Sequence, residues 1–122
     1  MGKEAGESGN SESIVVFIRA DAIGRGDEEL GSNLMVNFIY HLRNADPIPD
    51  AIVMMNAGVK LVAEDSEVLD DLKELESKGA EILACGTCLR FFDLEEKLEV
   101  GAKSNMSQIT NTLMNASRII TV

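Results

Sequence analysis

The five consecutive apolar residues at 14–18 limit what this chain can fold into more than any other feature. A run of β-branched and aromatic side chains without polar alternation is typical of a strand buried on both faces of a parallel sheet. Further strand-like segments occupy residues 51–55, 81–84 and 118–122. Such a sheet needs cover on both faces, so we expect amphipathic helices between its strands.

Helical periodicity fills the intervals between these segments. Apolar residues recur at three- and four-residue spacing over about 27–44, 65–79 and 104–114. Each stretch has side chains that can cap its start: Asp27, Asp65 or Ser66, and Ser104 or Asn105. Residues 89–98 are ambiguous, and 98–101 could form a short extended segment. The alternation predicts one α/β domain with a mostly parallel sheet over residues 14–122.

Residues 1–13 have a different composition from the rest of the chain. They hold three Gly, three Ser and three Glu, with no β-branched or aromatic residue. A segment of this kind buries too little apolar surface to offset the entropy of ordering it. We therefore predict a disordered tail or linker here.

The charge balance excludes several classes of partner. The 122 residues include 11 Lys and Arg against 21 Asp and Glu, a net charge of −10. Nucleic acids and anionic membranes bind basic patches, so we expect neither as a partner. Neither a membrane span nor a signal peptide is visible, which favours a cytoplasmic protein. Eight acids and two lysines fall within 64–81. We interpret this charge as a solvated helix face, with an interaction surface as the alternative.

Ligands of open α/β sheets bind in the loops that leave the carboxyl ends of strands, which here are 21–27, 56–61 and 85–89. The first loop has Gly24 and Gly26, but Glu29 stands where a dinucleotide fingerprint needs its third glycine. The acidic residues around it would also repel a pyrophosphate. We interpret these glycines as a tight turn and expect no nucleotide cofactor.

The third loop contains the pair Cys85 and Cys88, directly after a predicted strand. Donors and the dipole at a helix N-terminus can stabilise a thiolate there. Gly86 allows a donor or acceptor sulfur to approach closely, and Thr87 adds a hydroxyl. The chemistries open to the pair are a zinc site completed by another chain, thioredoxin-like dithiol exchange and a persulfide carrier; two buried structural thiols are the further alternative.

Of these chemistries, the residues favour the persulfide carrier. With one histidine, the two cysteines cannot complete a zinc site within one chain, so we expect no metal. Thioredoxin-like folds carry a proline after the motif, whereas both prolines here precede it. A persulfide carrier needs only a readily ionised thiol at the end of the strand.

Polar residues from the neighbouring loops are candidate binding residues for the same crevice. Asn56, Gly58 and Lys60 follow the second strand, where an amide and an ammonium could stabilise a persulfide anion. Asp21 follows the first strand as a possible site carboxylate. The alternative for Asn56 and Asp21 is a local role in their turns, with Lys60 solvated. We interpret His41 as a partly buried packing residue.

Several motifs occur in order along the chain: Asp21-x-x-Gly24-x-Gly26-Asp27, Asn56-Ala57-Gly58-Val59-Lys60-Leu61, Gly79-Ala80-Glu81-Ile82, Cys85-Gly86-Thr87-Cys88-Leu89, Val100-Gly101 and Asn105-Met106. Together they resemble the carboxy-terminal domain of YedF-type proteins. These belong to the DsrE/DsrF-like family and are described as sulfurtransferase-like selenium metabolism proteins. The resemblance covers about residues 14–122.

The resemblance implies a DsrE-like, three-layer α/β/α sandwich, sulfur-relay chemistry and a homo-oligomer. By the same likeness the carrier thiol is Cys85, with Cys88 as a resolving or second carrier thiol. YedF-type proteins have a small TusA-like domain before this one, which implies a TusA-like donor or acceptor of sulfur as partner.

We therefore predict a persulfide-carrying, sulfurtransferase-like domain. The alternative is a non-catalytic module that binds a small anion or a protein in the same crevice. The leading prediction requires that the Cys85 sulfur is reachable by solvent and easily ionised.

Overall fold

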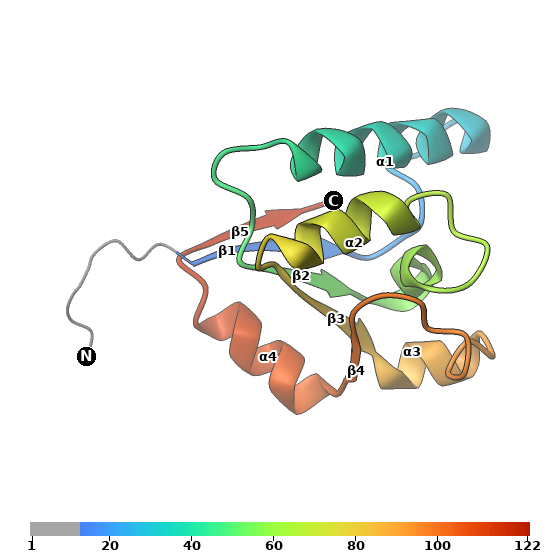
Figure 1. Ribbon diagram of the computed structural model, residues 1–122. Helices are drawn as coiled ribbons and strands as arrows, with labels where there is room; N and C mark the ends of the chain where they lie inside the picture. The colour runs from blue at the N-terminus through green and yellow to red at the C-terminus, as the bar shows by residue number, and fades with distance from the viewer. Residues whose placement is uncertain (1–12) are drawn as a thin grey trace.

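Five parallel strands form the centre of the structure, a computed structural model that describes residues 13–122 (Figure 1). The strands are β1 (Ile14–Ile18), β2 (Ala51–Met54), β3 (Glu81–Cys85), β4 (Ala102–Ser104) and β5 (Arg118–Thr121). They lie in the order β4-β3-β2-β1-β5, and every neighbouring pair is parallel. The strands predicted at 14–18, 51–55, 81–84 and 118–122 are thus confirmed to within one residue.

Helices cover both faces of this sheet. They are α1 (Glu28–Arg43), the 3₁₀ helix η1 (Asn56–Val62), α2 (Leu69–Ser77), α3 (Gly86–Phe91) and α4 (Met106–Met114). Figure 1 shows α1 and α2 side by side on one face, with α3 and α4 on the other. The predicted three-layer α/β/α arrangement with a parallel sheet is confirmed.

The core lies between these layers. It consists of strand residues and of one apolar stripe from each covering helix. The largest fully buried side chains include Ile18, Met35, Ile39, Ile52, Met54, Leu72, Leu75, Leu83, Leu89 and Ile109. β1, β2 and β3 contribute continuous apolar runs because a parallel strand in mid-sheet is packed on both faces.

Two of the three predicted helix starts are confirmed by their caps. The Asp27 carboxylate accepts the Leu30 N–H at 2.8 Å, and the Asn105 side chain accepts the Gln108 N–H at 2.8 Å. The cap predicted for α2 at residues 65 or 66 is wrong. There the Ser66 hydroxyl accepts the Val68 N–H in a local turn, and the helix begins only at Leu69.

The region after α3 differs from the expectation as well. The extended strand lies at Ala102–Ser104 instead of 98–101, and Leu98 forms an isolated antiparallel bridge with Ala63. Gly101, with φ +80, turns the chain into β4, and an added Cβ there would lie 2.8 Å from the Ile82 carbonyl oxygen. The position of β4 is therefore set by its close approach to β3, which local periodicity does not report.

The predicted tail at 1–13 lies outside the described residues, apart from Ser13. The Ser13 carbonyl accepts hydrogen bonds from the N–H groups of Ser117 and Arg118. Its own N–H donates to the Ser117 hydroxyl at 3.2 Å. Backbone hydrogen bonds therefore tie Ser13 to the start of β5.

The edge strand β5 is poorly covered. All four residues of this strand are exposed, including Ile119 (43%) and Ile120 (40%), whose side chains alternate between the two faces. No described strand pairs with its outer side. This exposure is unusual because strands of parallel sheets are normally covered on both faces.

The packing of η1 against the end of β1 requires a glycine. A Cβ added to Gly58 would lie 2.6 Å from the Ile18 carbonyl oxygen, so Gly58→Ala must push η1 away from the sheet. We expect a loss of about 1–3 kcal/mol in the free energy of unfolding, measured by urea denaturation.

Gly24→Ala is the matched control for this substitution. Gly24 has φ +80 but no atom within 4 Å of an added Cβ. Gly24→Ala should therefore lower the free energy of unfolding only by the cost of a left-handed backbone at alanine, about 1 kcal/mol. If Gly58→Ala is no more destabilising than Gly24→Ala, the steric explanation is wrong.

Candidate functional site

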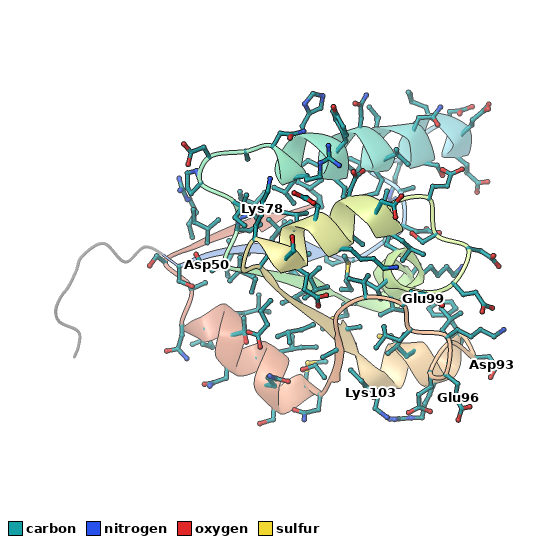
Figure 2. The ribbon with its side chains drawn as sticks, viewed as in Figure 1. Asp50, Lys78, Asp93, Glu96, Glu99 and Lys103 are labelled. Carbon is teal, nitrogen blue, oxygen red and sulfur yellow. The ribbon has the colours of Figure 1, made fainter. Side chains whose placement is uncertain are left out.

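The carboxyl ends of β1, β2 and β3 meet at one edge of the sheet, and the candidate residues follow these ends. β3 passes into α3 without a loop, because Cys85 is both the last strand residue and the N-cap of the helix. The opposite edge carries Asp50 and Lys78, well separated from α3 in Figure 2. The thiols therefore lie at the edge where ligands of this architecture usually bind.

The two cysteines differ in exposure. Cys85 is 3% exposed and belongs to the hydrophobic core, whereas Cys88, one turn further along α3, is partly exposed. The expectation that the Cys85 sulfur is open to solvent is wrong. It fails because β4 lies beside β3 and α3 packs closely on it, which encloses the strand end.

Gly86 makes this close packing possible. A Cβ at this position would lie 3.0 Å from the Ser104 carbonyl oxygen and 3.2 Å from Cγ of Lys103. Lys103, labelled in Figure 2, extends past α3 to Glu95, where its ammonium lies 2.8 Å from the carboxylate. Gly86 thus has a steric role between α3 and β4, while Thr87 between the cysteines is exposed.

The Cys88 sulfur is held by a neighbouring segment. Its Sγ accepts the backbone N–H of Asn56 at 3.1 Å, so the first residue of η1 contacts α3. The predicted proximity of Asn56 to the thiols is therefore present, but the backbone amide makes the contact. Asn56 has φ +53, a conformation that asparagine tolerates better than most residues.

The surroundings of Cys88 favour its protonated form. Burial raises the pKa of this thiol above its ordinary value, and the hydrogen bond to the Cys85 side chain raises the pKa further. The Asn56 N–H acts in the opposite direction because it stabilises the thiolate, but it does not outweigh the other two. The Cys88 thiol is therefore harder to ionise than an ordinary cysteine.

The other predicted site residues lie in a separate group. Asp21 and Lys60 both line a cavity of about 500 Å³, which neither cysteine lines. The Lys60 ammonium lies 4.8 Å from the centre of the Phe92 ring. Gly58 is buried against β1 and faces neither the cavity nor the thiols. The structure therefore divides the predicted site into a thiol pair with Asn56 and a neighbouring cavity.

Several cavity residues were not singled out from the sequence. Phe92 lies four residues after Cys88, at helical spacing, and this spacing is a signal that could have identified it. Glu64, Asp65 and Glu67 also line the cavity. They precede α2, so the interpretation of this acidic stretch as one helix face is wrong for its first residues.

Other features stand apart from the site. His41 is exposed, so the interpretation as a partly buried residue is wrong; its ring meets that of Tyr40 edge to face. Within residues 13–122, no three His, Cys, Asp or Glu side chains gather so that they could hold a metal ion. No helix in the same range is long and apolar enough to cross a membrane.

The raised pKa of Cys88 predicts a specific alkylation profile. Only the thiolate reacts with iodoacetamide, so the rate of Cys88 modification should reach its midpoint at a higher pH than that of free cysteine. Cys85→Ala removes one cause of the shift and should move the midpoint to lower pH. Peptide mapping by mass spectrometry measures the rate at each pH.

Cys85→Ser is the matched control, because a hydroxyl keeps a hydrogen-bonding partner beside Cys88. Its midpoint should lie between those of the wild type and Cys85→Ala. A midpoint that stays unchanged in Cys85→Ala would contradict the role assigned to this neighbour.

Solved structures with the same fold cover nearly the whole chain. The ychN protein of E. coli superimposes with a TM-score of 0.68 at 16% identity, covering 91% of this chain and 99% of its own. MTH1491 of Methanobacterium thermoautotrophicum superimposes with a TM-score of 0.66 at 21% identity, covering 92% of this chain and 100% of its own. BT1422 of Bacteroides thetaiotaomicron superimposes with a TM-score of 0.63 at 19% identity, covering 95% of this chain and 100% of its own. The last two are described as proteins of unknown function.

Sequence comparison identifies the family. No curated protein matches the chain. A family model does match, over residues 10–122, which include every strand and helix described above. The fold and this match agree: the chain belongs to the DsrE/DsrF-like family.

Proposed function

We propose that this protein carries sulfur as a persulfide, and that Cys88 is the thiol that receives it. The observation that supports this most directly is the position of the Cys88 sulfur. It is partly exposed at the carboxyl edge of the sheet, and it accepts the Asn56 N–H at 3.1 Å. The family to which the chain belongs is associated with sulfur relay in general, which agrees with this assignment.

The first step is the attack of the Cys88 thiolate on the outer sulfur of a donor persulfide, R–S–SH. A bond forms between Cys88 Sγ and that sulfur while the S–S bond of the donor breaks, and the donor leaves as R–S⁻. An acceptor thiolate then attacks the outer sulfur of Cys88–S–SH, and the Cys88 thiolate leaves. The Asn56 N–H stabilises the anionic sulfur before the first step and after the second.

The bound sulfur can also be released by a reaction with Cys85. Cys85 precedes Cys88 by about one helical turn, and it is close enough to contribute to the raised pKa of the Cys88 thiol, so we assign it the attack on Cys88 Sγ of the persulfide. That attack forms a Cys85–Cys88 disulfide and expels the outer sulfur as hydrosulfide. In this proposal the roles are exchanged relative to the sequence-based expectation: Cys88 is the carrier and Cys85 the resolving thiol, because Cys85 is 3% exposed.

The finer assignment is part of the same proposal. The Cys85–Leu89 motif and the other motifs quoted above support a YedF-type carboxy-terminal domain, a link to selenium metabolism and a TusA-like partner in the cytoplasm. Selenium resembles sulfur in this exchange. The Cys88 sulfur is partly exposed beside the Asn56 N–H, and this site suits a bound selenium as well as a bound sulfur. Thr87 is exposed between the cysteines, and we assign it contact with the incoming donor.

Persulfide formation can be measured directly. After incubation with glutathione persulfide, we expect a mass increase of about 32 Da, one sulfur atom, on the peptide that contains Cys88. The adduct should be absent from Cys88→Ser. It should persist longer in Cys85→Ser, because that variant has no resolving thiol to expel the sulfur.

Two outcomes would overturn the assignment. An adduct that forms on Cys85 and survives in Cys88→Ser would return the carrier role to Cys85. An intact fold with no adduct on either cysteine would reject persulfide transfer and leave the alternative, a module that binds an anion or a protein without chemistry.

We also propose that the protein is a homo-oligomer that assembles through β5. This edge strand exposes Ile119 and Ile120, and residues 101–122 contain no Asp or Glu. Because this stretch includes β5, two copies that meet at this strand bring no β5 carboxylates together, whereas residues 1–100 carry all 21 acids of the chain. Antiparallel pairing of β5 with β5 of a second copy would continue the sheet across a two-fold axis.

Ile120→Lys tests this arrangement because it places a charge in the proposed contact. We expect the wild type to sediment as a dimer or larger assembly and Ile120→Lys to sediment as a monomer in analytical ultracentrifugation. Leu30→Lys, at an exposed apolar residue of α1 (56% exposed), should assemble like the wild type. A monomeric wild type, or equal effects of both substitutions, would contradict the proposal.

A further inference from the structure

The cavity beside the thiol pair has no part in the transfer steps described above. It measures about 500 Å³ and is bounded by α1, η1 and the segments at 63–68 and 92–94. The buried side chains of its lining are apolar: Met35, Leu61 and Val68 are each at most 8% exposed. This volume falls within the usual range of ligand sites, about 300–1,000 Å³.

The exposed part of the lining is strongly acidic. It contains one ammonium group, that of Lys60, and the following carboxylates: Asp21, Glu64, Asp65 and Glu67. The Lys60 ammonium faces the Phe92 ring at 4.8 Å. The four ion pairs described within residues 13–122 join other side chains, in α1 and α2 and around α3. The negative charge at this opening therefore has no ion-pair partner among those described.

An apolar interior beneath an acidic rim selects a particular ligand chemistry. Anions are repelled by the carboxylates, and a purely apolar ligand would leave these charges without a partner. Arginine and lysine side chains meet both requirements, since their alkyl stems pack on apolar surface while the charged ends stay near the rim. The volume leaves space for more than one such side chain.

The position of the cavity connects it to the thiols. Lys60 belongs to η1, whose first residue donates its N–H to the Cys88 sulfur. Phe92, on another side of the cavity, follows α3, and its N–H donates to the Cys88 carbonyl oxygen at 3.1 Å. A protein held at the cavity therefore lies against both segments that position the Cys88 sulfur.

We propose that this cavity docks a basic, partly apolar segment of the protein that exchanges sulfur with Cys88. The identity of the partner rests on the proposed function, but the docking itself requires no sulfur chemistry. The partner is recognised by Arg or Lys residues interspersed with apolar ones. The net charge of −10 on this chain draws such a partner in from a distance.

The acetylated and amidated peptide Leu-Arg-Leu-Arg, labelled with a fluorophore, is a suitable probe. We expect fluorescence anisotropy to show saturable binding to the full chain, and no binding of the matched peptide Leu-Glu-Leu-Glu. The double variant Glu64→Gln with Glu67→Gln should bind the basic peptide about tenfold more weakly.

A second double variant separates local docking from general charge attraction. Glu81→Gln with Glu96→Gln removes the same two charges from exposed positions outside the cavity and should bind like the wild type. Equal weakening by both double variants, or no saturable binding by the wild type, would overturn the proposal.

The double variant Cys85→Ser with Cys88→Ser distinguishes docking at the cavity from sulfur transfer. This protein cannot form a persulfide, yet its affinity for the basic peptide should match that of the wild type. If the wild type binds the peptide but acquires no sulfur, docking stands and transfer fails. If it acquires sulfur but does not bind the peptide, transfer stands and docking at this cavity fails.

Discussion

The direct passage from β3 into α3 is the constraint on which the site depends. No loop separates the strand from the helix, so Cys85 remains within the core while Cys88 reaches the surface one turn later. The helix can start there only because Gly86 lets it approach the Ser104 carbonyl oxygen and the stem of Lys103. A Cβ at this position would have to displace these neighbours by a few tenths of an ångström. Gly86 therefore eases the close packing of α3 on β4, beside which Cys85 is buried.

The Cys88 sulfur is subject to opposing influences. Burial and the neighbouring Cys85 thiol favour the protonated form of Cys88, while the Asn56 amide favours the thiolate. A thiol in this balance is protected from indiscriminate oxidation, because the reactive thiolate is scarce. An approaching partner that adds positive charge near the sulfur would shift the balance toward the thiolate. Under the proposed function, the loading of Cys88 would then depend on the presence of the partner.

Local patterns predicted much of this fold. The apolar run at 14–18, the cap at Asp27 and the cap at Asn105 depend on neighbours in sequence, and the structure agrees with all three. The start of α2 was missed because Ser66 forms a turn of its own instead of a cap. The burial of Cys85 and the position of β4 were missed because they depend on contacts between distant segments. The cavity likewise joins α1, η1 and a loop after α3, and no single stretch of sequence contains it.

The pairing of β1 with β5 affects how the molecule can be made. β1 is the first strand, yet one of its two neighbours in the sheet is the last strand, in register from Ile14 with Arg118 to Phe17 with Thr121. During synthesis on the ribosome, β2 can pair with one side of β1 as soon as it emerges. The other side of β1 stays unpaired until β5 is made, since Arg118 comes 100 residues after Ile18. Throughout that interval an apolar strand has an unsatisfied backbone edge, which chaperones or nascent neighbours can occupy.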